Sequence, residues 1–273
     1  MKVLDSYADF EGSGSSDKQM QLLIYAEKEN LNDQPAPSDN GEAGAVVQMN
    51  QKTGSKKQEI RRKTMSNHRI IIRPETSADY RAVESLTREA FWNVYRPGCM
   101  EHYVLHCYRK DPAFVPELDL VMERDGELIG QVIYVRSEID CDNGRKVPIM
   151  TFGPISIAPA YKRQGYGKQL LDYSMEKAKE MGAGALAITG NIDFYGKSGF
   201  VPAKTKGIHY ADDPEADYFL IKELTPGFLD GINGSYKDPE GYFVCEKDPE
   251  GFEKFEASFP KKEEMKKPGQ LFS

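Results

Sequence analysis

From about residue 69 onward, the apolar positions of the chain follow strand spacing and helix spacing in turn. A β-branched run at 69–74 ends in a proline, and the next segment repeats its apolar residues every three or four positions, as an amphipathic helix does. A second helix is expected to end at Asp111-Pro112. The remaining pattern predicts helices after 167 and at 191–198, and strands at 118–123, 127–136, 147–158, 185–189, from 199, and at 216–224.

The strand predicted at 127–136 is apolar on both faces, which is typical of a central strand covered by helices. The element order is therefore strand, two helices, three strands, helix, strand, helix and two strands. This order predicts an α/β fold, or α+β in some schemes, with its main domain at residues 69–224.

The two ends of the chain differ from this domain. Residues 1–64 are rich in Gly, Ser and Pro and finish in a basic cluster, so we expect a disordered extension. Residues 225–273 form a C-terminal extension that packs on the domain, with a strand-like run at 241–245 and a helix from Pro249 to about Ala257. This extension could lengthen the sheet, cover an acceptor cleft or form a dimer contact, and the sequence leaves the three alternatives open.

Composition narrows the class of protein. The net charge of -7 provides no basic field for nucleic acid, and no apolar run approaches the ~20 residues of a membrane span. The four cysteines form no Cys-x-x-Cys pair, and no apolar N-terminal run suggests secretion. We therefore expect a cytoplasmic protein that binds neither nucleic acid nor membranes.

A glycine turn joins the strand predicted to end at Ala158 to the helix after Gly167. Gly165 and Gly167 allow a tight bend, so successive backbone N–H groups can converge ahead of the helix. The positive end of the helix dipole favours an anion there, and Lys162, Arg163 and Lys168 add positive charge. The turn is not a Walker loop, because no Gly-Lys-Ser/Thr follows it.

The spacing of Lys162, Gly165 and Gly167 resembles the pyrophosphate loop of the GNAT superfamily of acyl-CoA-dependent N-acetyltransferases, Arg/Gln-x-x-Gly-x-Gly/Ala. Lys162 departs from the usual first residue, because it keeps the cation but loses the planar fork of arginine. The run 194–200, Phe-Tyr-Gly-Lys-Ser-Gly-Phe, is similar to a second signature of that superfamily. The fuller pattern, including residues 97–99 and 226–231, resembles a bacterial subgroup whose acceptors are unassigned.

The resemblance implies a mixed, mostly antiparallel seven-stranded sheet whose fourth and fifth strands splay apart around acetyl-CoA. Gly153 and Pro154 fit a local irregularity at this splay, since both disturb regular strand pairing. The cofactor-binding residues implied are Ile155, Ser156, Ile157, Lys162, Arg163, Gln164, Gly165, Tyr166, Gly167, Lys168 and Asn191. Asn191 has the alternative role of a helix N-cap.

By the same resemblance Tyr195 is the general acid that protonates the departing thiolate, although it could instead only pack in the cleft. The general base stays open between Glu101, Glu123, Asp193 and a water. Trp92, Tyr95 and Arg96 are the candidates to contact the acceptor, with core packing as the alternative for Trp92. No metal is expected, because His102 and His106 have no evident third ligand.

The function expected is transfer of an acetyl group from acetyl-CoA to a primary amine of a small molecule or peptide. The alternative is a non-catalytic acyl-CoA-binding or interaction module on the same fold. A second copy of the chain is a further candidate partner. The identity of the acceptor does not follow from the sequence.

Overall fold

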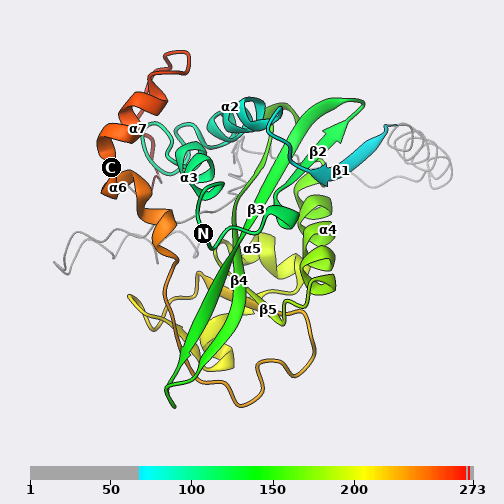
Figure 1. Cartoon of the computed structure of the whole chain (residues 1–273), viewed down its shortest axis with the longest axis vertical. Coiled ribbons are helices and arrows are strands. Elements are labelled where there is room, and N and C mark those ends of the chain that lie inside the picture. The colour runs from blue at the N-terminus through cyan, green and yellow to red at the C-terminus, as the bar shows by residue number, and fades with distance from the viewer. Residues whose placement is uncertain (1–67, 269, 271–273) are drawn as a thin grey trace, which may run out of the picture.

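One nine-stranded sheet runs through the part of the chain that the computed structural model describes, residues 68–268 and 270 (Figure 1). The extension expected at 1–64 lies outside these residues. Seven strands follow one another across the sheet in the order β1 (Ile70–Pro74), β2 (Leu120–Arg124), β3 (Glu127–Cys141), β4 (Lys146–Ile157), β5 (Ala185–Thr189), β8 (Phe219–Glu223) and β6 (Val201–Pro202). These are the seven strands that the sequence predicts.

All neighbours along this path are antiparallel except β4 and β5, which are parallel. The sheet is therefore mixed and mostly antiparallel, as expected. Two more strands, β7 (Ile208–Tyr210) and β9 (Gly234–Tyr236), pair with each other, and β9 also pairs with β3. Both were missed because three residues are too few to show an alternating pattern.

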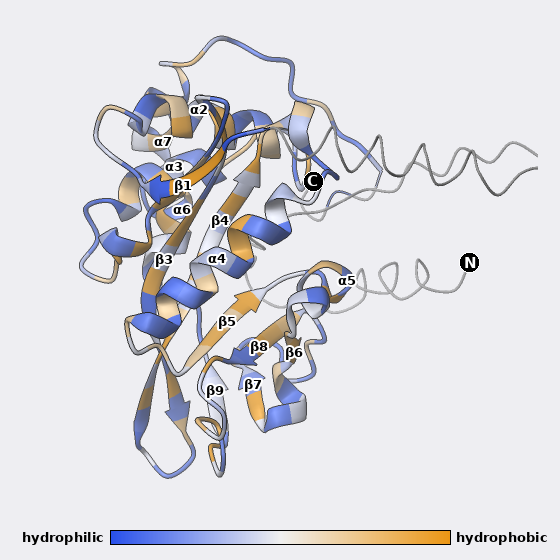
Figure 2. Cartoon of the chain, turned by 90° about the vertical axis from the view of Figure 1, so that its right-hand side faces the viewer, coloured by the Kyte–Doolittle hydropathy of each residue, from blue (hydrophilic) through white to orange (hydrophobic). Residues whose placement is uncertain are grey.

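Helices cover both faces of the sheet (Figures 1 and 2). On one face Leu170 and Leu171 of α4 pack with Ile155 and Ile157 of β4. On the other face the core joins the α2 and α3 helices to β2 and β3. The helices are α2 (Tyr80–Phe91), α3 (Glu101–Tyr108), α4 (Tyr166–Glu180), α5 (Ile192–Tyr195), α6 (Val244–Lys247) and α7 (Pro249–Glu256), with 3-10 turns at Pro116–Leu118, Pro159–Tyr161, Gly196–Ser198, Ala203–Lys206 and Glu240–Phe243.

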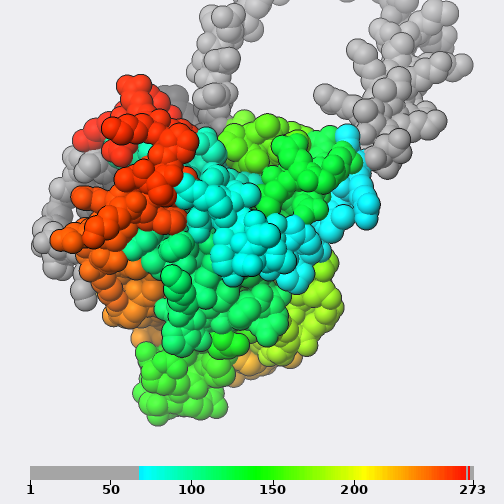
Figure 3. All heavy atoms as spheres, turned by 45° about the horizontal axis from the view of Figure 1, so that its top comes forward, coloured from blue at the N-terminus to red at the C-terminus, as the bar shows by residue number. Residues whose placement is uncertain are grey.

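The C-terminal segment returns to the domain at two places. β9 lies beside the far end of β3, where Tyr236 pairs with Ile139. Farther on, Phe255 of α7 packs on the Tyr103 ring of α3, with ring centroids 5.2 Å apart, and Glu256 forms ion pairs with Arg88 and His102. Figure 3 shows these last residues lying against the surface of α2 and its neighbours. The first alternative for the extension, a lengthened sheet, is therefore present through β9. The strand-like run expected at 241–245 is wrong, because these residues form the 3-10 turn Glu240–Phe243 and the start of α6.

A buried carboxyl group lies where this segment leaves β9. The Tyr210 hydroxyl donates a 2.7 Å hydrogen bond to Asp238 Oδ2, and Asp238 is only 8% exposed. Burial raises the pKa of Asp238 to about 6, and the nearby charge of Asp212 adds to the rise while the hydrogen bond from Tyr210 opposes it. The folded protein therefore holds this proton more tightly than the unfolded chain does.

We predict that Asp238→Asn changes the pH dependence of stability. The stabilising effect of the Asp238 proton is complete below about pH 4 and is lost as the pH rises through about 6. The free energy of unfolding of the wild type relative to the variant should therefore fall by on the order of 3 kcal/mol between pH 4 and pH 7.5. Urea unfolding at both pH values measures this. Asp142→Asn, at an exposed position, is the control, and a pH-independent difference for Asp238→Asn would contradict the prediction.

Candidate functional site

The glycine turn presents a row of uncommitted backbone amides at the start of α4. Arg163 and Gly165 both have positive φ, 61° and 91°, and Gly165 is the N-cap of the helix. Among the described residues, no hydrogen bond is donated by a backbone N–H of residues 163–168, and the first in the helix runs from Gln169 to the Gly165 carbonyl, 3.0 Å. Such a run of N–H groups at the positive end of a helix dipole is suited to an anion.

The three cations expected near this anion differ in their surroundings. Lys162 Nζ donates a 2.8 Å hydrogen bond to the Ala90 carbonyl near the end of α2, and burial lowers its pKa. Lys168 forms an ion pair with Asp172 on the surface of α4. Arg163 is exposed beside the amides. Lys162 therefore joins the turn to α2. The resemblance of Lys162 to a phosphate-binding residue did not indicate this contact.

The strands β4 and β5 part directly behind this turn. Their pairing consists of Met150 with Leu186 and Thr151 with Ala187, and β4 then continues to Ile157 without β5 (Figure 2). Phe152 pairs with Tyr134 of β3, and Ile155 pairs with Val132. Three residue steps along β4 therefore match two along β3, so β4 holds one extra residue in a bulge. The irregularity expected at Gly153 and Pro154 is therefore confirmed.

Beyond the bulge, the backbone amides of β4 alternate in direction. Ala158 N–H donates to the Ile129 carbonyl of β3, 2.8 Å, and this fixes the alternation along the antiparallel pair. The amides of Ile155 and Ile157 consequently face away from β3, towards the side that β5 has left. Ser156 differs from both, because its amide faces β3 and its Oγ accepts a hydrogen bond from Gln131 Nε2, 3.1 Å.

Tyr195 and Asn191 lie on the short segment after β5. The Tyr195 ring is fully buried, and its centroid lies 5.8 Å from that of Phe152, next to the bulge. Gly190 faces this ring so closely that an added Cβ would lie 2.4 Å from Tyr195 Cε2. Asn191 is the N-cap of α5, because its Oδ1 accepts a hydrogen bond from the Asp193 amide, 2.8 Å. The structure thus shows the capping alternative for Asn191 and places Tyr195 at the base of the splay.

The three residues expected at the acceptor site share the loop between α2 and α3. Trp92 Nε1 donates to the Glu263 carbonyl, 3.0 Å, and the Arg88 guanidinium lies 4.0 Å from the ring centroid. Tyr95 is buried with its ring centroid 6.0 Å from that of Phe91, and Arg96 Nη1 lies 2.9 Å from Met100 Sδ. The C-terminal segment contacts the Trp92 ring. The surroundings of Trp92 therefore match the packing role that was its alternative.

The carboxylates that the sequence left open as bases have other partners or lie in solvent. Glu101 accepts a hydrogen bond from the Met100 amide, 3.0 Å, and Glu123 accepts one from Arg73 Nε, 2.9 Å. Asp193 is exposed. The two histidines pair with different carboxylates, His102 with Glu256 and His106 with Glu84.

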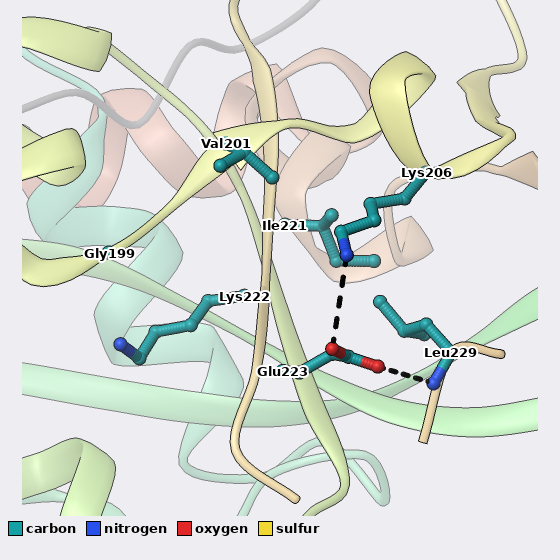
Figure 4. Close-up of a pocket in the computed structure, with 7 residues that line it drawn as sticks. All are labelled: Gly199, Val201, Lys206, Ile221, Lys222, Glu223 and Leu229. Carbon is teal, nitrogen blue, oxygen red and sulfur yellow. Dashed lines mark hydrogen bonds and ion pairs between the residues drawn. The ribbon is translucent and has the colours of Figure 1, made fainter. Parts of the chain in front are cut away.

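An open cavity of about 240 Å³ lies at the β6–β8 edge of the sheet (Figure 4). Its charged residues already have partners. Lys206 lies 4.0 Å from Glu223, which also accepts a hydrogen bond from the Leu229 amide, and Lys222 Nζ donates to the Ser198 carbonyl, 2.5 Å. None of its lining residues belongs to the glycine turn or to β4. We therefore do not place the site in this cavity.

A mixed sheet that splits between two parallel strands, with a turn suited to an anion behind the split, is the arrangement expected of acyl-CoA-dependent acetyltransferases. Residues 71–203 match the family model described as acetyltransferase (GNAT) domain. This part of the chain is therefore a GNAT acetyltransferase domain, as the two sequence motifs predicted. Within residues 68–268 and 270, no helix has the length and apolarity that crossing a bilayer requires.

Known relatives agree with this assignment. The uncharacterized N-acetyltransferase YhbS of Escherichia coli strain K12 is 23% identical over 165 residues, which cover 60% of this chain and 93% of YhbS. The crystal structure of E. coli YhbS in complex with CoA covers 64% of this chain and 92% of that one, with a TM-score of 0.56. A GNAT family acetyltransferase from Brucella melitensis, crystallised with acetyl-CoA, is 22% identical, has a TM-score of 0.52 and covers 64% and 99%. These likenesses establish the fold.

Three residues of the site gave no sequence signal. Tyr242, Gln131 and Thr87 are buried around β4, where Tyr242 and Gln131 hydrogen-bond its backbone and the Thr87 hydroxyl lies 3.3 Å from that of Ser156. Each lies in a segment whose sequence predicts only a helix, a strand or a tail. Their roles depend on which strands and helices meet, and a local pattern does not contain that information.

Proposed function

We propose that this chain moves an acetyl group from acetyl-CoA to a primary amine by direct attack of the amine on the thioester. The observation that carries this proposal is the row of uncommitted amides at 163–168 beside the parting of β4 from β5. The two likenesses crystallised with CoA and acetyl-CoA support the identity of the donor.

In this proposal the pyrophosphate of acetyl-CoA binds the amides of the turn and the exposed Arg163 side chain. The residues that hold it are Arg163, Gln164, Gly165, Tyr166, Gly167 and Lys168. The pantetheine arm then lies along β4, where the Ile155 and Ile157 amides face the splay. Lys162 and Ser156 support these contacts from behind, because each is hydrogen-bonded within the protein. The Asn191 Nδ2 group is the further donor for the arm.

The chemical step needs an amine in its neutral form next to the thioester carbonyl. The amine nitrogen bonds to the carbonyl carbon, the carbon–sulfur bond breaks, and Tyr195 gives its hydroxyl proton to the departing sulfur. The excess proton of the attacking nitrogen leaves to solvent. Backbone amides facing the splay stabilise the negative charge that develops on the carbonyl oxygen. We place this reaction in the cytoplasm, since all four cysteines are free thiols.

We predict that Gly165→Glu abolishes acetyl-CoA binding while Gly165→Ala retains it. Both variants place a Cβ in open space at φ 91°, so both bear the same backbone strain of about 1–2 kcal/mol. Only glutamate brings a carboxylate to the phosphate position, and this repulsion should weaken binding at least about a hundredfold. Isothermal titration calorimetry measures both affinities. Equal affinities for the two variants would contradict the proposed phosphate site.

We predict that Tyr195→Phe lowers kcat about 10²- to 10⁴-fold with little change in the KM for acetyl-CoA. Phenylalanine keeps the ring contacts with Phe152 and removes only the proton donor. An acetyl-transfer assay on an amine panel measures the effect, with Tyr173→Phe at an exposed position of α4 as the control. Unchanged turnover would assign Tyr195 to packing alone. A wild type that binds acetyl-CoA and acetylates no amine would favour the non-catalytic module.

A further inference from the structure

Two neighbouring carbonyl groups of the β4 bulge each accept a hydrogen bond from a buried side chain. The Tyr242 hydroxyl donates to the Gly153 carbonyl, 3.1 Å, and Gln131 Nε2 donates to the Pro154 carbonyl, 3.1 Å. Tyr242 is 2% exposed and Gln131 is fully buried. A bulge takes its residues out of the regular ladder, so these two donors replace the strand partner that the carbonyls lack.

Both donors are held firmly. The Tyr242 ring packs edge-on against Tyr108, with centroids 4.8 Å apart, and Gly241 lies so close to Tyr108 that an added Cβ would be 2.6 Å from Cε1. Gln131 is fixed by its second hydrogen bond, to Ser156 Oγ, which lies 3.3 Å from Thr87 Oγ1 of α2. Neither side chain can turn away without disturbing the core around it.

The two contacts set the direction of the first amide beyond the bulge. The Pro154 carbonyl and the Ile155 N–H belong to one planar peptide unit and point in opposite directions. Gln131 lies on β3 and holds this carbonyl on the β3 side, so the Ile155 N–H is directed into the splay. Tyr242 holds the preceding peptide unit through the Gly153 carbonyl.

We propose that Tyr242 and Gln131 are positioning residues for acyl transfer, which aim the Ile155 amide at the acyl end of acetyl-CoA. The inference rests on the proposed function. It extends the candidate site beyond the residues that match the acetyltransferase family model, because Tyr242 lies after residue 203, in the C-terminal segment that follows β9. The segment contributes a fixed hydroxyl to the catalytic strand and does not merely cover the domain.

Tyr242→Phe tests this role with Tyr108→Phe as a matched control. Both tyrosines are buried, their rings touch, and the Tyr108 hydroxyl makes no hydrogen bond with the described residues. We expect Tyr242→Phe to weaken acetyl-CoA binding and to lower kcat, each about fivefold to tenfold, the effect of one lost hydrogen bond. We expect Tyr108→Phe to change neither. Calorimetry and the transfer assay measure the two quantities.

Binding of 3′,5′-ADP separates positioning from a general effect on the fold. This nucleotide carries the 3′-phosphate and one of the two pyrophosphate groups of CoA but no pantetheine arm, so its affinity should be the same in the wild type and in Tyr242→Phe. The inference is wrong if Tyr242→Phe weakens the binding of 3′,5′-ADP as much as the binding of acetyl-CoA. It is also wrong if Tyr242→Phe leaves acetyl-CoA binding and kcat unchanged, as expected of Tyr108→Phe. If Tyr242→Phe does not fold, the same comparison is made with Gln131→Met, which removes the hydrogen bond to the Pro154 carbonyl.

The two proposals fail in different ways. A wild type that binds acetyl-CoA without acetylating any amine would remove the proposed function. The selective loss of acetyl-CoA affinity in Tyr242→Phe would still stand in that case, because it is measured without turnover. Normal turnover in Tyr242→Phe together with normal binding would remove the positioning role and leave the transferase intact.

Discussion

The parting of β4 from β5 after Thr151 is the constraint on which the site depends. A parallel pair that continued would have used the amides of Ile155 and Ile157 in strand pairing. Because β5 ends its pairing early and β4 carries an extra residue, those amides face the gap. The glycine turn that follows β4 then brings the start of α4 to the same place. One irregular strand thus brings together the edge proposed for the pantetheine arm and the helix end proposed for the phosphates.

The features found from the sequence are those with a local signature. The seven main strands, the principal helices and the glycine turn each leave a repeat or a motif within about fifteen residues, and the structure contains them. The class of enzyme followed from the spacing of Gly165 and Gly167 and from the run around Tyr195. The bulge was expected because glycine and proline stand side by side at 153 and 154, and the register confirms it.

The features missed depend on contacts between distant segments. Tyr242 and Gly153 are 89 residues apart, and no pattern at either position indicates the other. Lys162 carries the charge expected of a phosphate ligand, yet the nearby end of α2 provides a carbonyl that takes its ammonium group. Trp92 is similar, because the chain returns past residue 260 to meet its ring nitrogen. Charge and aromaticity identify what a side chain can do, and the tertiary fold selects its partner.

The pairing of β9 with β3 bears on how this protein can be divided. Residues 234–236 occupy an edge that β2 leaves vacant, and they pair with residues 139–141 at the far end of β3. The residues that match the family model, 71–203, therefore stop short of a strand that pairs with β3. Recombination that exchanged only residues 71–203 would separate β3 from its partner strand β9. A functional exchange would therefore have to include both segments.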